Sequence, residues 1–202
     1  MERSATIRSE HGIFDFTAHM DRLVAHVVAT CPELGHIRLK HVLVCCAQCR
    51  RGGRRGVQAR VVPLRFPEGA VTQSVGQHLY QVPPLTHQGR DILYLIYFYL
   101  PRFLDAPRLE DKLATVCHEL YHISPACDGD LRRFPGRAHT HGPSRKRYHA
   151  RARELAQAYL AGLDGQGLGP AWFLQHGFAA LQRRQGPVVG RHVPLPKVRR
   201  VV

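Results

Sequence analysis

Residues 117–123 read C-H-E-L-Y-H-I, and the interpretation of the whole chain starts from this stretch. Two histidines, His118 and His122, stand four positions apart, and Glu119 follows the first. On an α-helix, residues at positions i and i+4 point the same way. If residues 117–123 are helical, the two imidazoles lie side by side and can share one ligand.

Independent signals place this stretch on a helix. Asp105-Ala106-Pro107 is a typical helix start, with Asp105 as the cap and a proline in the first turn. Pro125 ends the helix, because the residue before a proline avoids helical geometry. We therefore expect a helix from Asp105 to about Ile123.

The expected helix has two opposed faces. Leu109, Leu113, Val116 and Leu120 recur at spacings of four, three and four residues and form an apolar stripe. At ~100° per residue, His118 lies about 180° from Leu109. The apolar stripe would anchor the helix on the core, while the histidines would line a cleft. The alternative is a surface helix that carries two solvated histidines, or a helix whose two histidines are satisfied within the core.

This histidine pair predicts a catalytic zinc site. Neutral imidazole nitrogens bind Zn²⁺, and a catalytic zinc takes three protein ligands and keeps one position for water. Zinc lowers the pKa of that water to about 7, and Glu119 is placed to accept its proton. We therefore expect a zinc-dependent peptide hydrolase with His118 and His122 as metal ligands and Glu119 as the general base.

The third zinc ligand is open among four candidates: Asp128, His139, His141 and Glu154. Asp128 stands where an extended form of the motif has its last ligand, but that form uses a glycine turn and this chain has Pro125. Glu154 lies on the next expected helix. His141 comes just before that helix, next to Gly142-Pro143, and we favour it on ligand type and position.

Further residues near the motif are candidates for supporting roles: Asp128, Asp130, Arg132, Arg137 and Tyr148. Asp128 or Asp130 would accept a hydrogen bond from a ligand imidazole and fix its tautomer. Arg132 or Arg137 would hold a substrate carbonyl or carboxylate, and Tyr148 would stabilise an oxyanion. The alternative is a turn held by Asp–Arg pairs, with Tyr148 in the core.

The remaining segments predict an α+β fold. Residues 14–31 have the apolar spacing of an amphipathic helix. The apolar segments 37–49 and 57–64 flank a Gly-Gly turn with arginines on either side, and they predict a β-hairpin. Residues 92–100 are apolar at both parities, which is typical of a strand covered on both faces.

Two more helices are expected, over residues 144–160 and near residues 171–183. The expected architecture is a small mixed or antiparallel sheet packed on the N-terminal helix and on the H-E-x-x-H helix, with further C-terminal helices. The length suits one domain. We expect a flexible tail over 1–12, the domain over 13–185, and a basic, proline-containing tail over 186–202.

Several stretches resemble a phage-type metallopeptidase family that is similar to the SprT/Spartan-like zincins. They are H-E-L-Y-H-I-S-P at 118–125, D-G-D-L-R-R-F-P-G-R at 128–137, and H-G-P-S with Tyr148, preceded by V-V-P-L-R-F-P-E-G and Y-F-Y-L-P-R-F-L. The resemblance covers roughly residues 35–160 of the chain. It implies a zincin fold, Zn²⁺, ligands at His118, His122 and His141, and proteolysis of DNA-associated proteins.

The resemblance has two departures. Tyr148 stands further from the third histidine than the family's aromatic residue does, and the four-cysteine zinc ribbon of SprT proteins is missing. The missing ribbon leaves DNA recruitment in the SprT manner unsupported. The competing hypothesis is a non-catalytic nucleic-acid-binding or phage-associated module with a structural or vestigial metal site.

The composition sets the remaining expectations. The formal net charge of +14 favours a polyanionic partner such as nucleic acid, besides a protein or peptide substrate. No apolar run approaches the ~20 residues that span a membrane. The N-terminus lacks an apolar signal segment, so a cytoplasmic protein of bacterial or phage origin is expected. The sequence does not indicate an oligomeric state.

Overall fold

A computed structural model describes residues 12–49, 56–134, 141, 144–163 and 167–201. The expected tail 1–12 lies outside the described residues except for Gly12, as does the arginine-rich turn at 50–55. The α-helices are α1 Phe16–Thr30, α2 Leu109–Tyr121, α3 Arg145–Ala161 and α4 Phe178–Gln185. Short 3-10 helices cover Pro32–Leu34, Leu39–His41, Pro67–Gly69 and Gly169–Gln175.

The strands form small sheets, and the fold is of the α+β class with a mixed central sheet. The first strands are β1 Phe14–Asp15, β2 Val42–Gln48, β3 Ala59–Pro63, β4 Thr72–Val75 and β5 His78–Gln81. They are followed by β6 Leu85–His87, β7 Arg90–Ile92, β8 Tyr94–Leu100, β9 Val188–Val189 and β10 Arg199–Arg200.

The central sheet has the order β2-β8-β3. β2 runs parallel to β8, and β3 runs antiparallel to it. The predicted hairpin of segments 37–49 and 57–64 is therefore wrong, because β8 enters between the two strands from further along the chain. β8 is the most apolar strand, so the middle position buries it on both sides. β3 is left as an edge strand.

β8 confirms the prediction of a strand covered on both faces. Tyr94, Ile96 and Phe98 belong to the main apolar core, which they share with α1 and α2. Leu95 and Tyr97 point the other way, into a smaller apolar cluster. This second face is covered partly by the C-terminal segment, since the Tyr97 hydroxyl donates to the carbonyl of residue 193 at 2.9 Å.

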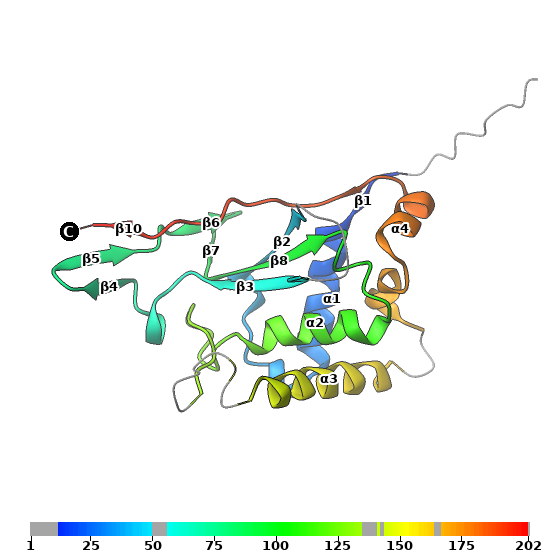
Figure 1. The fold of residues 1–202 in the computed structure, drawn as a ribbon, viewed down its shortest axis with the longest axis horizontal. Coiled ribbons are helices and arrows are strands. Elements are labelled where there is room, and N and C mark those ends of the chain that lie inside the picture. The colour runs from blue at the N-terminus through cyan, green and yellow to red at the C-terminus, as the bar shows by residue number, and fades with distance from the viewer. Residues whose placement is uncertain (1–11, 50–55, 135–140, 142–143, 164–166, 202) are drawn as a thin grey trace, which may run out of the picture.

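Two of the helices, α2 and α3, stack in layers below the central sheet. α2 lies against the sheet, α3 lies on the far side of α2, and α1 crosses behind both (Figure 1). α1 buries the predicted apolar side chains and begins at Asp15, whose carboxylate accepts a bond from the amide of Ala18 at 2.9 Å. The side chain of Ser144 caps α3 in the same way.

Two local helix predictions are wrong. Asp105 does not cap α2, which begins at Leu109; its carboxylate instead accepts a bond from the amide of Phe178 at 2.8 Å, at the start of α4. The single helix expected near 171–183 is a 3-10 helix over Gly169–Gln175 followed by α4. In both places a contact distant in sequence replaces the local signal.

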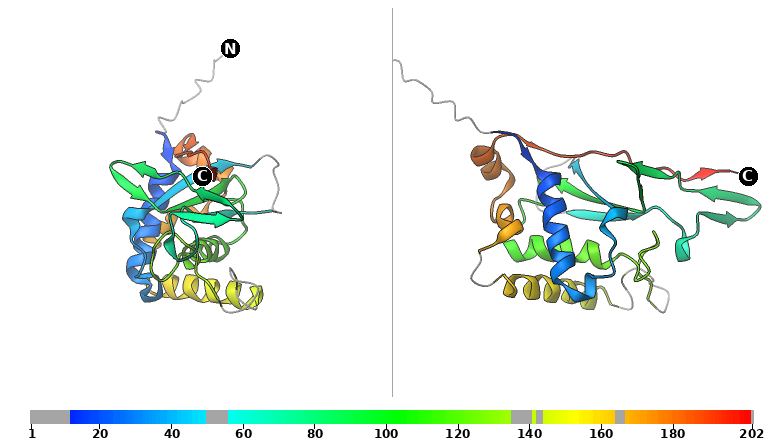
Figure 2. Two further views of the ribbon diagram at one scale, coloured as in Figure 1. Left: turned by 90° about the vertical axis from the view of Figure 1, so that its left-hand side faces the viewer. Right: turned by 180° about the vertical axis from the view of Figure 1, so that it is seen from behind.

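The C-terminal segment runs back along the whole molecule. β9 pairs with β1, and β10 adds a third strand to β4 and β5 in a sheet that projects from the body (Figure 2). Between them, the amide of Arg191 donates to Thr17 and its carbonyl accepts from Cys46. No described helix is both long and apolar enough to cross a membrane.

Candidate metal centre

Helix α2 positions His118 and His122 at one end, as the sequence pattern predicts. Leu113, Val116 and Leu120 are buried in the main core, and they anchor one face of the helix. His118 lies on the last turn of α2, and His122 is its C-terminal cap residue. The two imidazoles therefore project from the end of a helix that the core holds in place.

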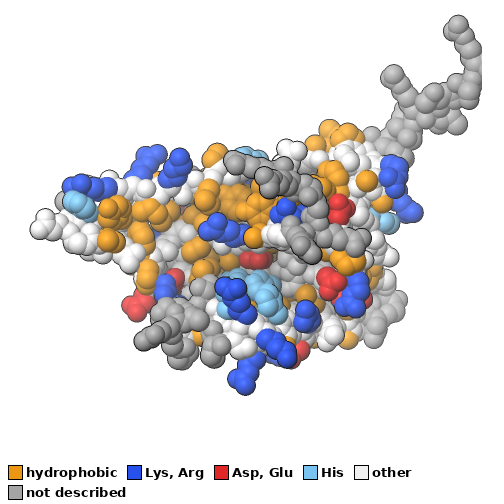
Figure 3. Space-filling view, in the orientation of Figure 1, with side chains coloured by type: hydrophobic (Ala, Val, Ile, Leu, Met, Phe, Trp, Pro, Cys, Tyr) orange, Lys and Arg blue, Asp and Glu red, His pale blue; other side chains and the backbone are white. Residues whose placement is uncertain are grey.

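Three imidazoles converge at this end of α2. Single ring nitrogens of His118, His122 and His141 all lie within 4.8 Å of one another. The Nε2 atoms of His118 and His122 are 3.1 Å apart. A tetrahedral zinc with Zn–N bonds of 2.0–2.1 Å has ligand nitrogens about 3.3 Å apart. The cluster can thus hold a metal ion, and the histidines form the pale-blue patch at the centre of Figure 3.

The surroundings favour the metal-binding form of these histidines. Burial, with the neighbouring imidazoles adding to it, lowers the pKa of His118 to about 4 and that of His122 to about 3. Both rings are therefore neutral near pH 7, as metal ligation requires. Their Nδ1 atoms are buried and have no hydrogen-bond partner among the described residues. At 3.1 Å the two facing Nε2 atoms can share a hydrogen bond in one pair of tautomers, or bind one metal ion when both are unprotonated.

The structure separates the candidates for the third ligand. It brings His141 into the cluster, whereas Asp128 accepts a bond from the hydroxyl of Ser124 at 2.6 Å. Glu154 forms an ion pair with Arg151 at 2.6 Å on the exposed side of α3. His139 lies outside the described residues. No fourth His, Cys, Asp or Glu joins the cluster in the described part of the chain.

Glu119 is held between α2 and the edge of the sheet. Its side chain is buried, with 6% of the residue exposed, and Oε2 accepts a bond from the main-chain amide of Val61 on β3 at 2.7 Å. Burial raises the pKa of this carboxyl to about 7, against the weaker lowering effects of the Val61 amide and of Arg60. With this pKa the carboxyl group is partly ionised at neutral pH, and its carboxylate form can accept a proton.

A cavity of about 470 Å³ opens beside these groups. His118 and Glu119 line it, together with Gln58 before β3 and residues of β3, α2 and α3 that are mostly small: Ala59, Ala114, Thr115, Ala152 and Arg153. Glu119 and one histidine of the cluster, His118, thus border an open cavity on one side.

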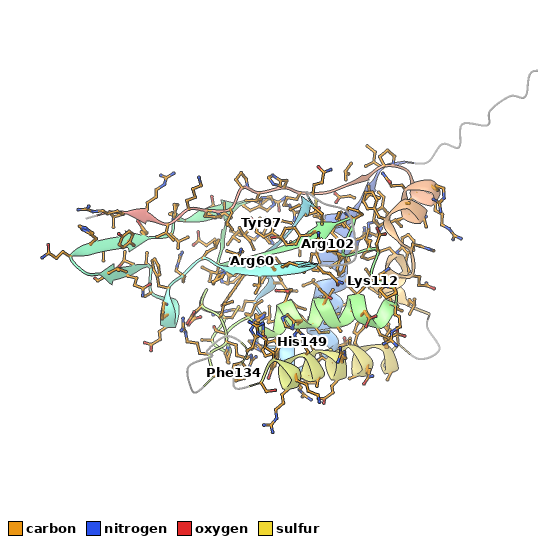
Figure 4. The ribbon with its side chains drawn as sticks, viewed as in Figure 1. Arg60, Tyr97, Arg102, Lys112, Phe134 and His149 are labelled. Carbon is orange, nitrogen blue, oxygen red and sulfur yellow. The ribbon has the colours of Figure 1, made fainter. Side chains whose placement is uncertain are left out.

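His149 is a site residue that the sequence reasoning missed. It lies on α3, where Figure 4 shows it between α2 and α3, and it lines the same cavity as Glu119. Its ring stacks on that of His118, with centroids 4.9 Å apart and an angle of 14° between the planes. The sequence of α3 contains no signal for this position, because the approach of His149 to His118 depends on how α3 packs against α2.

Tyr148 sits among the three clustered histidine rings. Its ring stacks on His122 at 4.8 Å and meets His118 at 4.8 Å and His141 at 5.0 Å. The residue is buried, and its hydroxyl has no hydrogen-bond partner among the described residues. Burial raises the pKa of Tyr148, so the hydroxyl stays protonated and can donate.

The aspartates after α2 build a turn. Asp130 accepts two bonds from Arg133, at 2.6 and 3.0 Å, and another from the amide of Glu68. Neither it nor Asp128 bonds to a ligand histidine, so the structure shows the turn held by an Asp–Arg pair. Arg132 is placed over the ring of Tyr121 at 4.3 Å. Arg137 lies outside the described residues.

Comparisons with protein-family models, with curated proteins and with solved structures found no match.

Proposed function

We propose that this protein is a zinc-dependent metallopeptidase of zincin type that hydrolyses peptide bonds. One observation carries the proposal. Three neutral imidazoles converge beside a buried carboxylate and an open cavity, and no fourth protein ligand joins them among the described residues. Structural zinc sites fill all four positions, whereas catalytic ones keep a position open.

Each residue of the centre has a separate role in the proposed hydrolysis. Zinc, when bound to His118, His122 and His141, supplies Lewis-acid chemistry that polarises a carbonyl and makes water more acidic. Glu119 accepts a proton from the attacking water and passes it to the leaving amine, as the new C–O bond forms and the C–N bond breaks. The amide of Val61 holds the Glu119 carboxylate in place through both transfers.

The alternative of a structural or vestigial site gives Glu119 no purpose. Burying a carboxylate costs free energy unless another group compensates it, and a purely structural site needs no base at this position. The exposed basic side chains at the start of α3, Arg145, Lys146 and Arg147, support substrates of negative charge or substrates held on DNA.

The test combines metal binding with proteolysis. Zinc content is measured by mass spectrometry, and cleavage of an unfolded protein is measured with and without DNA. We expect one zinc per chain. Zinc at 100 times its Kd should add about 2.7 kcal/mol to the free energy of unfolding, and the melting temperature should rise accordingly. Glu119→Gln should keep zinc and lose cleavage, whereas His141→Ala should lose both.

Glu110→Gln on the exposed side of the same helix is the matched control and should cleave normally. A zinc-loaded wild type that cleaves nothing, with or without DNA, contradicts the proposal. So does a fourth protein ligand in an anomalous-diffraction map at the zinc edge.

A further inference from the structure

A second pocket borders the histidine cluster. It has a volume of about 280 Å³ and shares no lining residue with the larger cavity. The two are joined through the metal centre, because His118 lines the first and His141 lines the second, with ring centroids 5.5 Å apart. A peptide that crosses the centre would therefore reach both pockets.

The walls of this pocket are aromatic. Tyr121, Phe134 and Tyr148 line it, and the ring of Tyr148 lies 5.1 Å from that of Tyr121 and 5.9 Å from that of Phe134. Ligand pockets for whole small molecules usually have about 300–1,000 Å³. This smaller pocket suits one side chain of a longer substrate.

The pocket has one arginine that is free to meet a ligand. Arg147 and Arg151 are the charged side chains that line it among the described residues. Arg151 is already paired with Glu33 and Glu154. The side chain of Arg147 has no ion-pair partner among the described residues, so this guanidinium is available to a ligand.

The cations at the start of α3 do not serve the helix. Arg145, Lys146 and Arg147 stand in its first turn, which contains no acidic residue. The positive end of the helix dipole lies there, so cations in the first turn are unfavourable and anions are preferred. An arrangement that costs helix stability next to a pocket points to a negatively charged ligand.

We propose that this pocket binds an acidic side chain of the substrate, glutamate best, on one side of the scissile bond. This inference rests on the proposed peptidase function. The aromatic walls contact the methylene groups, and the Arg147 guanidinium donates hydrogen bonds to the carboxylate. A lysine at the same substrate position meets like charge, and a leucine leaves the guanidinium unused.

The experiment selects random peptides displayed on phage against zinc-loaded Glu119→Gln, which needs no cleavage. We expect glutamate or aspartate to be enriched at one position. A selected peptide should lose at least about tenfold in affinity when its glutamate is replaced by glutamine. In the Arg147→Glu background the preference should turn to lysine or arginine, whereas Arg184→Glu, an exposed change on α4, should leave it unchanged.

The outcomes separate the two proposals. If acidic residues are enriched in the selected peptides but the zinc-loaded wild type cleaves nothing, the peptidase proposal is overturned and the acidic-side-chain pocket is supported. If the wild type cleaves but the selected peptides show no acidic preference, or if Arg147→Glu does not alter that preference, the pocket proposal alone is overturned. Binding of a single-stranded oligonucleotide that competes with the peptides and is lost in Arg147→Glu assigns the pocket to phosphodiesters and also overturns it.

Discussion

Replacing Glu119 with glutamine should stabilise the metal-free protein at alkaline pH. The ordinary pKa of a glutamate carboxyl is 4.5, and burial in the folded protein raises that of Glu119 to about 7. A group whose pKa is raised by folding contributes its full stability below the unfolded pKa and loses it as pH rises through the folded one. At pH 8 the buried carboxylate is ionised, so the free energy of unfolding of the wild type is lowered by the full effect of its burial.

The size of the effect follows from the two pKa values. Each unit between them corresponds to about 1.4 kcal/mol, so the ionised carboxylate costs about 3 kcal/mol at pH 8. Glutamine has nearly the same shape, carries no charge and can still accept the bond from the Val61 amide. For a chain of this length, a gain of 3 kcal/mol raises the melting temperature by about 6–12 °C.

The assay is urea denaturation in EDTA between pH 4.5 and 8, for the wild type, Glu119→Gln and Glu110→Gln. The stability difference between Glu119→Gln and the wild type should be near zero at pH 4.5 and grow to its full size at pH 8. Glu110→Gln, which removes a half-exposed carboxylate from the same helix, is the control. A Glu119→Gln difference that stays constant across this range would refute the reasoning, because the carboxyl would then titrate alike in both states.

Two further substitutions test the neighbouring contacts. Burial raises the pKa of Asp130, but the bonds from Arg133 and from two main-chain amides outweigh it and hold this pKa below 3.8. Asp130→Asn should therefore cost about 2 kcal/mol at pH 7 by thermal unfolding, and the loss should shrink as pH falls below 3.8; an equal loss at pH 3 contradicts this. Tyr148→Phe removes a buried hydroxyl without a partner, so metal-free stability should hold or rise, while kcat/KM of the zinc enzyme should fall about a hundredfold. Unchanged kcat/KM would leave Tyr148 as a packing residue.

The helix of the site could be read from the sequence because its signals are local. The spacing of the leucines, the H-E-x-x-H pattern and the position of Pro125 all lie within one segment, and α2 follows them. The same local logic failed for Asp105, which has the right residue type for a cap. Its carboxylate bonds to Phe178, 73 positions away, and no local rule reports such a partner.

The sheet order could not be read for a related reason. A Gly-Gly turn between two apolar segments predicts that they approach each other, but it does not say whether a third strand separates them. β8 provides that strand because it is apolar on both parities and gains most from the central position. His149 escaped notice because its place depends on how α3 packs against α2, which the helix's own periodicity does not fix.

The bond between Glu119 and β3 has a consequence for how the sequence can vary. The donor at position 61 is the main-chain amide, which every amino acid except proline possesses. Drift at position 61 can therefore change the size of a core side chain without removing the bond that holds the carboxylate. In relatives of this protein, position 61 should vary freely among apolar residues and exclude proline, while position 119 stays fixed.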